Sequence, residues 1–324
     1  MIEDLVPRLL AGDRWAISKL ITLVEQQDAG LAELTHVLAP HTGHSYCVAV
    51  TGPPGSGKST LVDALTQLLR QEGRTVGVLA VDPTSPYSGG AVLGDRIRMQ
   101  RHYLDTGVFI RSMATRGSRG GIATALGWAV QVLDAAGKDV VLVETAGVGQ
   151  TEVDVTTVAD TVVVVMVPEA GDTIQTMKAG IMEIADIFVV NKGDREGAGE
   201  MATALKAMLS MGQRDGGWSV PVVVTQAHLG DGVPELWEHI QRHRDYLVSS
   251  SQLEARRKER RVHAFTAYLE EAVHRRIKRL LQGDGELAKL VKAVEAGEVD
   301  PIAGAEKAVG KSLLSDQLRS PERR

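Results

Sequence analysis

The chain has 324 residues, of which 44% are hydrophobic, and a formal net charge of −5. This length allows one large domain or one domain with appendages, and the negative charge argues against bulk binding to nucleic acid or to an anionic membrane. The single cysteine, Cys47, excludes an internal disulfide and every cysteine-rich metal site. The acidic start lacks the basic segment of a signal peptide, and the longest apolar runs are too short to span a bilayer. These features favour a cytoplasmic protein.

Three regions differ in their residue pattern. In residues 1–43, apolar residues recur at three- and four-residue steps, which predicts a helical extension. Residues 44–250 alternate short β-rich runs with helical stretches, and several runs are continuously apolar, as in a parallel sheet buried on both faces. This alternation predicts an α/β fold with a doubly wound, mostly parallel sheet. The β-rich runs are residues 45–52, 75–82, 139–145, 161–167, 187–191 and 220–225.

The third region, residues 251–324, is charged and helical, and we expect it to form a C-terminal arm. An apolar stripe at helical spacing must pack on the preceding domain or on a second chain. The basic stretch 256–261 lies beside this stripe and is expected to remain solvated. The stripe consists of Val262, Phe265, Leu269, Val273, Ile277 and Leu280.

Residues 52–59 fit the phosphate-binding pattern G-x-x-x-x-G-K-[ST] at every position. An apolar run precedes them and a helical run follows, as this motif requires. The glycines let backbone N–H groups turn inward around phosphate oxygens, and the next helix adds the positive end of its dipole. We expect Lys58 to reach the β- and γ-phosphates and the Ser59 hydroxyl to ligate Mg²⁺. The predicted phosphate-binding residues are Gly52, Pro53, Pro54, Gly55, Ser56, Gly57, Lys58, Ser59 and Thr60.

A second motif, N-K-x-D at residues 191–194, directly follows an apolar run. The Asp194 carboxylate can accept hydrogen bonds from guanine N1–H and the exocyclic amine, whereas adenine offers neither donor. The Lys192 stem can lie along the base plane. The predicted base-binding residues are Asn191, Lys192 and Asp194, with a backbone contact expected from Thr225, Gln226 and Ala227.

Carboxylates end two of the predicted strands, at Asp82 and Glu144, where α/β sheets place their ligands. A carboxylate there can hold Mg²⁺ directly or through water. The Gly147 N–H is expected to face the terminal phosphate. Asp95, in a glycine-rich loop, either reaches the metal, positions the attacking water or caps the helix that follows. The predicted metal ligands are Ser59, Asp82, Asp95 and Glu144, and the predicted catalytic residues are Lys58, Asp95, Glu144 and Gly147.

The stretch 109–117 is interpreted as a loop. Its two arginines, Arg111 and Arg116, either stabilise phosphate charge or remain solvated.

Several long blocks resemble the MeaB/ArgK/MMAA family of G3E-class P-loop GTPases, a class named partly for the glutamate of its third motif, here Glu144. The resemblance covers almost the whole chain, including the stretches between the nucleotide motifs. Two positions depart from the family pattern: Gly193 stands where alanine is common, a change expected to be harmless, and Arg119 stands where leucine is expected. The matching blocks are residues 9–25, 50–60, 80–99, 111–117, 143–155, 168–192 and 297–310.

The resemblance implies a GTP-hydrolysing chaperone that gates adenosylcobalamin loading and protects an acyl-CoA mutase, usually methylmalonyl-CoA mutase. GTP, GDP and Mg²⁺ are the implied ligands, and the mutase and a second copy of the chain are the implied partners. A partner-contacting element is implied at residues 171–175. We expect no nucleic-acid or membrane partner.

Three other interpretations remain open at this point. A related metallocentre GTPase would load nickel or zinc, although Cys47 stands alone and the histidines form no clear tract. A nucleotide-switched scaffold with negligible turnover would use the basic stretch 256–261 as its contact. The label of an arginine transport kinase or ATPase competes as well, although the guanine motif speaks against an ATPase.

Overall fold

The computed structural model describes residues 2–26, 30–82, 99–114, 121–145, 157–168, 183–212, 217–283 and 285–310, with the side chains of Ala32, Asp82, Gln100, Ala114, 121–124, Gly212 and Gly310 left out. Among the predicted site residues, Asp95 and Gly147 lie outside the described residues, and Asp82 is described by its backbone alone. Arg116, Arg119 and the expected partner element at 171–175 also lie outside them. The chain divides into two compact units, Met1–Arg261 and Val262–Arg324.

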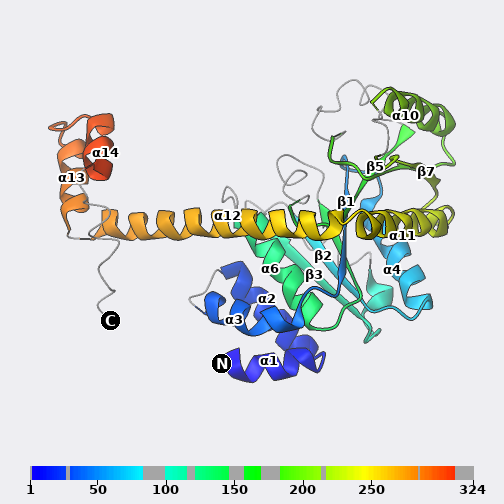
Figure 1. The fold of residues 1–324 in the computed structure, drawn as a ribbon, viewed down its shortest axis with the longest axis horizontal. Coiled ribbons are helices and arrows are strands. Elements are labelled where there is room, and N and C mark those ends of the chain that lie inside the picture. Colours follow the sequence, from blue (N-terminus) through cyan, green and yellow to red (C-terminus); the bar gives the residue numbers. More distant parts are fainter. Residues whose placement is uncertain are drawn as a thin grey trace. The chain divides into compact units, whose positions relative to one another are not determined.

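A seven-stranded sheet forms the centre of the first unit within the described residues, in the order β3-β2-β4-β1-β5-β6-β7 (Figure 1). Every neighbouring pair is parallel, which confirms the predicted doubly wound α/β fold. Because β1 lies between β4 and β5, its carboxyl end opens at the centre of the sheet edge where such folds bind ligands. The strands are β1 (Tyr46–Thr51), β2 (Val76–Asp82), β3 (Val108–Ala114), β4 (Val140–Thr145), β5 (Thr161–Met166), β6 (Ile187–Asn191) and β7 (Val222–Thr225).

Alternate strand residues face opposite sides of the sheet. On one side, Val48 and Val50 of β1 belong to a buried core shared with helices α4 (Lys58–Gln71) and α11 (Val233–Ser249). All six residues of β1, β4 and β5 are buried, because helices cover the opposite side as well. There α6 (Gly121–Ala135) packs so closely that a Cβ on Gly77 of β2 would lie 2.7 Å from Leu133. The helix α10 (Ala198–Gly212) contacts β6 and β7.

The N-terminal helices belong to the first unit and pack on α6, as the apolar periodicity of residues 1–43 implies (Figure 1). They are α1 (Ile2–Leu10), α2 (Arg14–Gln26) and α3 (Leu31–Leu38), followed by the short turn η1 (Ala39–His41). All but one of the apolar residues that predicted them are buried, and Leu10 is the exception at 41% exposure. The buried set is Leu5, Leu9, Ile17, Leu20, Ile21 and Val24.

The edge strand β3 corrects the interpretation of residues 109–117 as a loop. After the short turn η2 (Gln100–His102), residues 108–114 pair with β2 along its whole length. Arg111 of this strand points to α2, where Nη2 donates to Glu25 Oε2 at 2.6 Å and to Thr22 Oγ1 at 3.0 Å. Arg111 is thus neither a phosphate ligand nor a solvated loop residue. It joins the edge strand β3 to the N-terminal helix α2.

The helix α12 (Gln252–Gln282) begins in the first unit and continues into the second, where α13 (Glu286–Glu295) and α14 (Pro301–Gly310) pack against each other. Four residues of the stripe on α12 are exposed, from 37% at Val273 to 66% at Phe265, while Ile277 and Leu280 are half-buried. The expectation that the basic stretch 256–261 stays solvated is wrong for Arg257 and Arg260, whose side chains are only 21% and 17% exposed in ion pairs with Asp160. Among the described helices, none has the length and apolar character needed to cross a membrane.

Candidate nucleotide-binding site

The loop between β1 and α4 needs glycine at its two ends. Gly52 has a φ of +136°, and a Cβ there would lie 2.2 Å from the backbone oxygen of Val165 in β5. Gly57 has a φ of +88°, and its Cβ would lie 2.3 Å from the Asn191 Nδ2. Both positions combine a left-handed backbone with a close approach that excludes any side chain. The predicted phosphate-binding loop therefore packs directly against strand β5 at one end and against Asn191 of the second motif at the other.

Lys58 is the first residue of α4, and its side chain is buried beneath the loop. Its Nζ donates to the carbonyl oxygens of Gly52 and Pro53, both at 2.9 Å. The ammonium group is thus held inside the curve of the loop, next to the N-terminus of α4. A cation and a helix N-terminus together form a site for an anion such as a phosphate.

Ser59 and Glu144 come together at the same edge of the sheet. The Ser59 hydroxyl donates to Glu144 Oε1 at 2.5 Å, and both residues are buried. Glu144 lies on β4, in register with Val50 of β1, so the carboxylate stands beside the strand that leads into the loop. Hydroxyl and carboxylate oxygens are the ligands that Mg²⁺ prefers, and this pair fits the predicted metal position. No group of three or more His, Cys, Asp or Glu that could hold a metal occurs within the described residues.

Asn191, the last residue of β6, connects three segments of the site. Its Nδ2 donates to the backbone oxygen of Ser56 at 2.9 Å, within the phosphate-binding loop. Its Oδ1 accepts from Thr225 Oγ1 at 3.0 Å and from the Ala227 N–H at 3.2 Å. The structure thus brings the two predicted motifs together with the 225–227 segment. Asn191 binds protein groups on both sides of its amide, a role that sequence reasoning missed.

Lys192 and Asp194 follow in a tight turn. Lys192 has a positive φ of +57°, and the Arg195 N–H donates to its carbonyl at 3.0 Å. The Asp194 side chain is exposed. The carboxylate is therefore accessible from solvent, and its contact with a base stays a prediction.

Gly193 stands where alanine is common in the family, and in this structure the glycine is accommodated by close packing. Its N–H donates to the carbonyl of Thr225 at 2.9 Å. A Cβ would lie 2.6 Å from Val224 Cγ1 and 3.3 Å from that same carbonyl. A side chain at this position would press on the neighbouring strand β7.

The backbone of Gln226 is fixed by the turn that follows β7. Its N–H donates to the Asp231 carbonyl at 3.0 Å, and its own carbonyl accepts from Leu229 and Gly230. The 225–227 segment is thus held from both ends, by Asn191 and by this turn. Its contact with the base stays a prediction.

The geometry is that of a P-loop nucleotide site, and the family comparison decides which kind. Residues 17–281 match the family model described as methylmalonyl-CoA mutase-associated GTPase MeaB. The chain belongs to this family. As a MeaB-family member it is a GTPase, and guanine nucleotides are its ligands.

Similar proteins cover the chain from end to end. A candidate GTPase of Pyrococcus abyssi is 48% identical over 94% of this chain and 95% of its own length. The GTPase ArgK of Escherichia coli is 34% identical over 84% of this chain and 85% of its own. The methylmalonic aciduria type A homolog of Mus musculus is 32% identical over 79% of this chain and 66% of its own.

Among solved structures, one titled LAO/AO transport system kinase is similar over 98% of both chains, with 26% identity and a TM-score of 0.70. This likeness supports the same fold with its helical extensions. The word kinase in that name describes that protein.

Proposed function

We propose that this MeaB-family GTPase is a chaperone for an adenosylcobalamin-dependent acyl-CoA mutase, methylmalonyl-CoA mutase or a relative, in the cytoplasm. In this role, GTP binding and hydrolysis gate the loading of the cofactor and protect the loaded mutase. The observation that carries the proposal is the family match over residues 17–281, whose description names the association with methylmalonyl-CoA mutase. The name of the mouse relative, which refers to methylmalonic aciduria, agrees with it.

In the proposed cycle, Lys58 holds the β- and γ-phosphates and Asp194 selects guanine. Ser59 and Glu144, whose oxygens are hydrogen-bonded to each other, would hold Mg²⁺, because both are hard oxygen ligands. Asp82 and Asp95 are proposed as further carboxylates for the metal and the attacking water. The metal, when bound, neutralises charge that develops on the phosphate oxygens.

We further propose that residues from 251 onward form a dimerisation arm. Val262, Phe265, Leu269 and Val273 lie on one side of α12 at helical spacing and are 37–66% exposed. An apolar stripe of this kind packs well against its own copy, because the same residues are then buried on both chains.

The chaperone proposal is tested by mixing the full chain with the adenosylcobalamin mutase of its own organism. Complex formation and cofactor loading are measured with a GTP analogue, with GDP and without nucleotide. We expect both to depend on the nucleotide, and the Lys58→Ala variant to lose this dependence. A mutase that neither binds nor changes its loading in any state would contradict the proposal while leaving the GTPase assignment intact.

The dimer proposal is tested by sedimentation of the full chain and of Phe265→Ser/Leu269→Ser. We expect a dimer that becomes a monomer in this variant. The control is Glu270→Ser/His263→Ser, which changes exposed polar residues of the same helix and should stay dimeric. A monomeric unaltered chain would refute the dimer. A chain truncated at residue 250 is a poor test, because it also removes the arginines that neutralise Asp160 and Asp186.

A further inference from the structure

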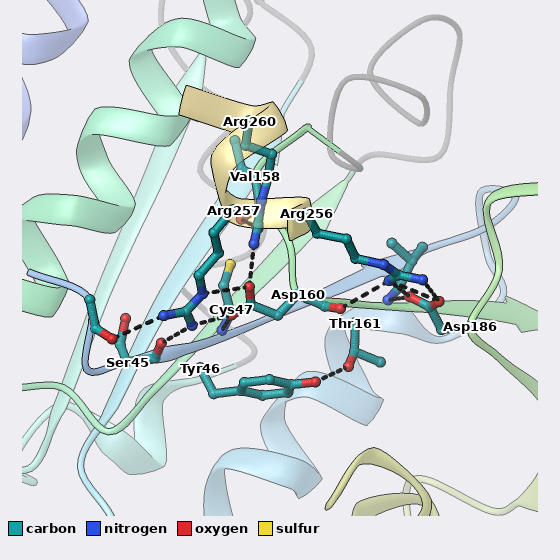
Figure 2. A network of polar contacts seen from close by, with 12 residues as sticks. Ser45, Tyr46, Cys47, Val158, Asp160, Thr161, Asp186, Arg256, Arg257 and Arg260 are labelled. Atoms are coloured by element: carbon teal, nitrogen blue, oxygen red, sulfur yellow. Dashed lines mark hydrogen bonds and ion pairs between the residues drawn. The ribbon is translucent and has the colours of Figure 1, made fainter. Parts of the chain in front are cut away.

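Arginines on one turn of α12 bind residues at the starts of β1, β5 and β6 (Figure 2). The nucleotide motifs follow the carboxyl ends of β1 and β6, so this turn lies at the opposite end of these strands. Arg257 donates from Nη2 to Asp160 Oδ2 at 2.8 Å and from Nε to Oδ1 at 3.1 Å. Arg260 forms an ion pair with the same carboxylate and donates to the Val158 carbonyl at 2.6 Å. Asp160 directly precedes β5, so both arginines hold the point where this strand begins.

The same turn also holds the beginnings of β1 and β6. Arg257 donates to the carbonyls of Gly43 and Ser45, both at 2.9 Å, just before β1. Arg256 pairs with Asp186 at 3.2 Å, just before β6. β1, β5 and β6 are neighbours in the sheet. The arginines of one helical turn therefore bind residues at the amino ends of three adjacent strands.

Asp160 sets the register between β1 and β5. Its N–H donates to the Cys47 carbonyl at 2.7 Å, and its Oδ2 accepts from the Cys47 N–H at 3.0 Å. Burial alone would raise the pKa of Asp160, but the hydrogen bonds and charges of Arg257 and Arg260 outweigh it and hold the pKa below its usual range. The carboxylate is therefore ionised and almost fully buried, so the arginines are what makes this register contact stable.

At the carboxyl ends of these strands, close contacts leave little room for one strand to move relative to its neighbour. The Gly52 Cα stands so close to β5 that a Cβ would lie 2.2 Å from the Val165 oxygen. At the end of β6, Asn191 is bound to the Ser56 carbonyl. A strand of six residues is about 20 Å long, and as a rigid element it carries a displacement at one end to the other. A shift of β1 against β5 at the Asp160 end is therefore transmitted to the start of the phosphate-binding loop.

We propose that Arg257, acting through Asp160, is a positioning residue for guanine nucleotide binding. From α12 it fixes the start of β1 against β5, and through these strands it sets the placement of the phosphate-binding loop. The inference deepens the proposed nucleotide cycle and rests on guanine nucleotide binding by this GTPase. It also means that the first turns of α12, where the proposed dimerisation arm begins, affect nucleotide binding.

The first test compares GDP affinities of full-length variants by calorimetry, with unfolding midpoints measured in parallel. Arg257→Ala should weaken GDP binding about three- to thirtyfold, the range typical of residues along a coupling network. The GDP affinity of Arg257→Lys should lie between those of Arg257→Ala and the unaltered chain, because an ammonium can pair with Asp160 but cannot also reach both carbonyls. The control is Arg261→Ala, whose ion pair with Glu254 is exposed, and it should bind GDP like the unaltered chain.

A purely structural role for Arg257 would lower the unfolding midpoint and leave GDP affinity unchanged, and that result would overturn the inference. An equal loss of affinity in Arg261→Ala would overturn it too, since a general charge effect would then suffice.

The second test needs no variant. Binding is reciprocal, so GDP must stabilise the contacts that favour its own binding. Saturating GDP should slow amide exchange at residues 252–261 of the unaltered chain, relative to α13. Unchanged exchange at these residues would refute the inference. Absence of GDP binding by the unaltered chain would instead overturn the nucleotide assignment itself.

Discussion

The Asn191 side chain donates from Nδ2 to the backbone oxygen of Ser56 at 2.9 Å, so the base motif and the phosphate-binding loop are hydrogen-bonded to each other. With Thr225 and Ala227 on its other side, the Asn191 amide oxygen is fully used within the protein, and one of its two N–H donors is used by Ser56. We therefore expect Asn191 mainly to organise the site and Asp194 to recognise the base. The two residues should respond differently to substitution.

Asn191→Ala should weaken GDP binding about ten- to hundredfold without changing base preference, because buried polar groups on Ser56 and Ala227 would lose their partner at a cost of about 1–3 kcal/mol. Calorimetry with GDP and with xanthosine diphosphate measures both quantities. A changed preference between the two ligands would show that Asn191 contacts the base.

Asp194→Asn should remove the preference for guanine. The carboxylate accepts from guanine N1–H and the exocyclic amine, whereas the amide can donate to the carbonyl that xanthine carries in place of that amine. We expect GDP affinity to fall by about a hundredfold or more and xanthosine diphosphate to bind better than GDP. Glu196→Gln removes the same charge from a neighbouring exposed residue and should preserve the preference. Equal GDP and ADP affinities in the unaltered chain would contradict the assignment.

Gly193→Ala should destabilise the protein by about 1–3 kcal/mol, the usual cost of overpacking. The new Cβ would lie 2.6 Å from Val224 Cγ1, so one side chain must move. Val224→Ala in the same chain should recover most of the loss, and urea unfolding of the four combinations measures the coupling. If the changes in unfolding free energy of the two substitutions simply add, the destabilisation does not come from the contact with Val224.

Arg111→Ala should lower stability by about 3 kcal/mol, because it leaves the Glu25 carboxylate without its partner. Glu25 has a side-chain exposure of only 11%. GTP turnover per folded molecule should stay unchanged, since Arg111 faces α2. The exposed pair of Arg242 with Glu238 provides the control, and its loss should cost less than about 1 kcal/mol. A tenfold loss of turnover in Arg111→Ala would restore a role at the phosphates.

GTP hydrolysis by the isolated chain should be slow and should rise with the mutase partner present. Val148 stands where small GTPases carry the glutamine that orients water, and a missing catalytic arginine can cost about 10³–10⁵ in rate. Lys58→Ala should abolish turnover and weaken phosphate binding, and Lys206→Ala, an exposed lysine on α10, should change neither. Turnover of tens per second by the isolated chain would contradict partner activation.

Most of the central sheet was predictable, because runs such as β1 and β5 are apolar at consecutive positions, a pattern typical of strands covered on both faces. Lys58, Ser59 and Glu144 were predictable as well, since a motif and a strand end mark them. The strand β3 was not predictable from the sequence. Its Arg111 and Ser112 break the apolar pattern, and the partner of Arg111 is Glu25, which lies 86 residues away.

The basic stretch on α12 was misinterpreted for the same reason. Charge spacing shows that arginines share a helix face, but it does not reveal what that face meets. Asp160 is 97 residues from Arg257 in the chain, and only the fold brings the two together. The packing around Gly193 was not predictable either, since the close contact comes from Val224 on a strand formed later in the sequence.

The burial of Cys47 has a practical consequence for spectroscopy. It is the sole cysteine of the sequence, it lies within β1, and burial together with the nearby Asp160 charge raises the pKa of its thiol. The buried thiol is therefore protected from alkylation in the folded protein. A cysteine introduced at an exposed position of α12 can thus carry a fluorophore or spin label without removal of the native one. Labelling at Cys47 itself would report unfolding of the central strand.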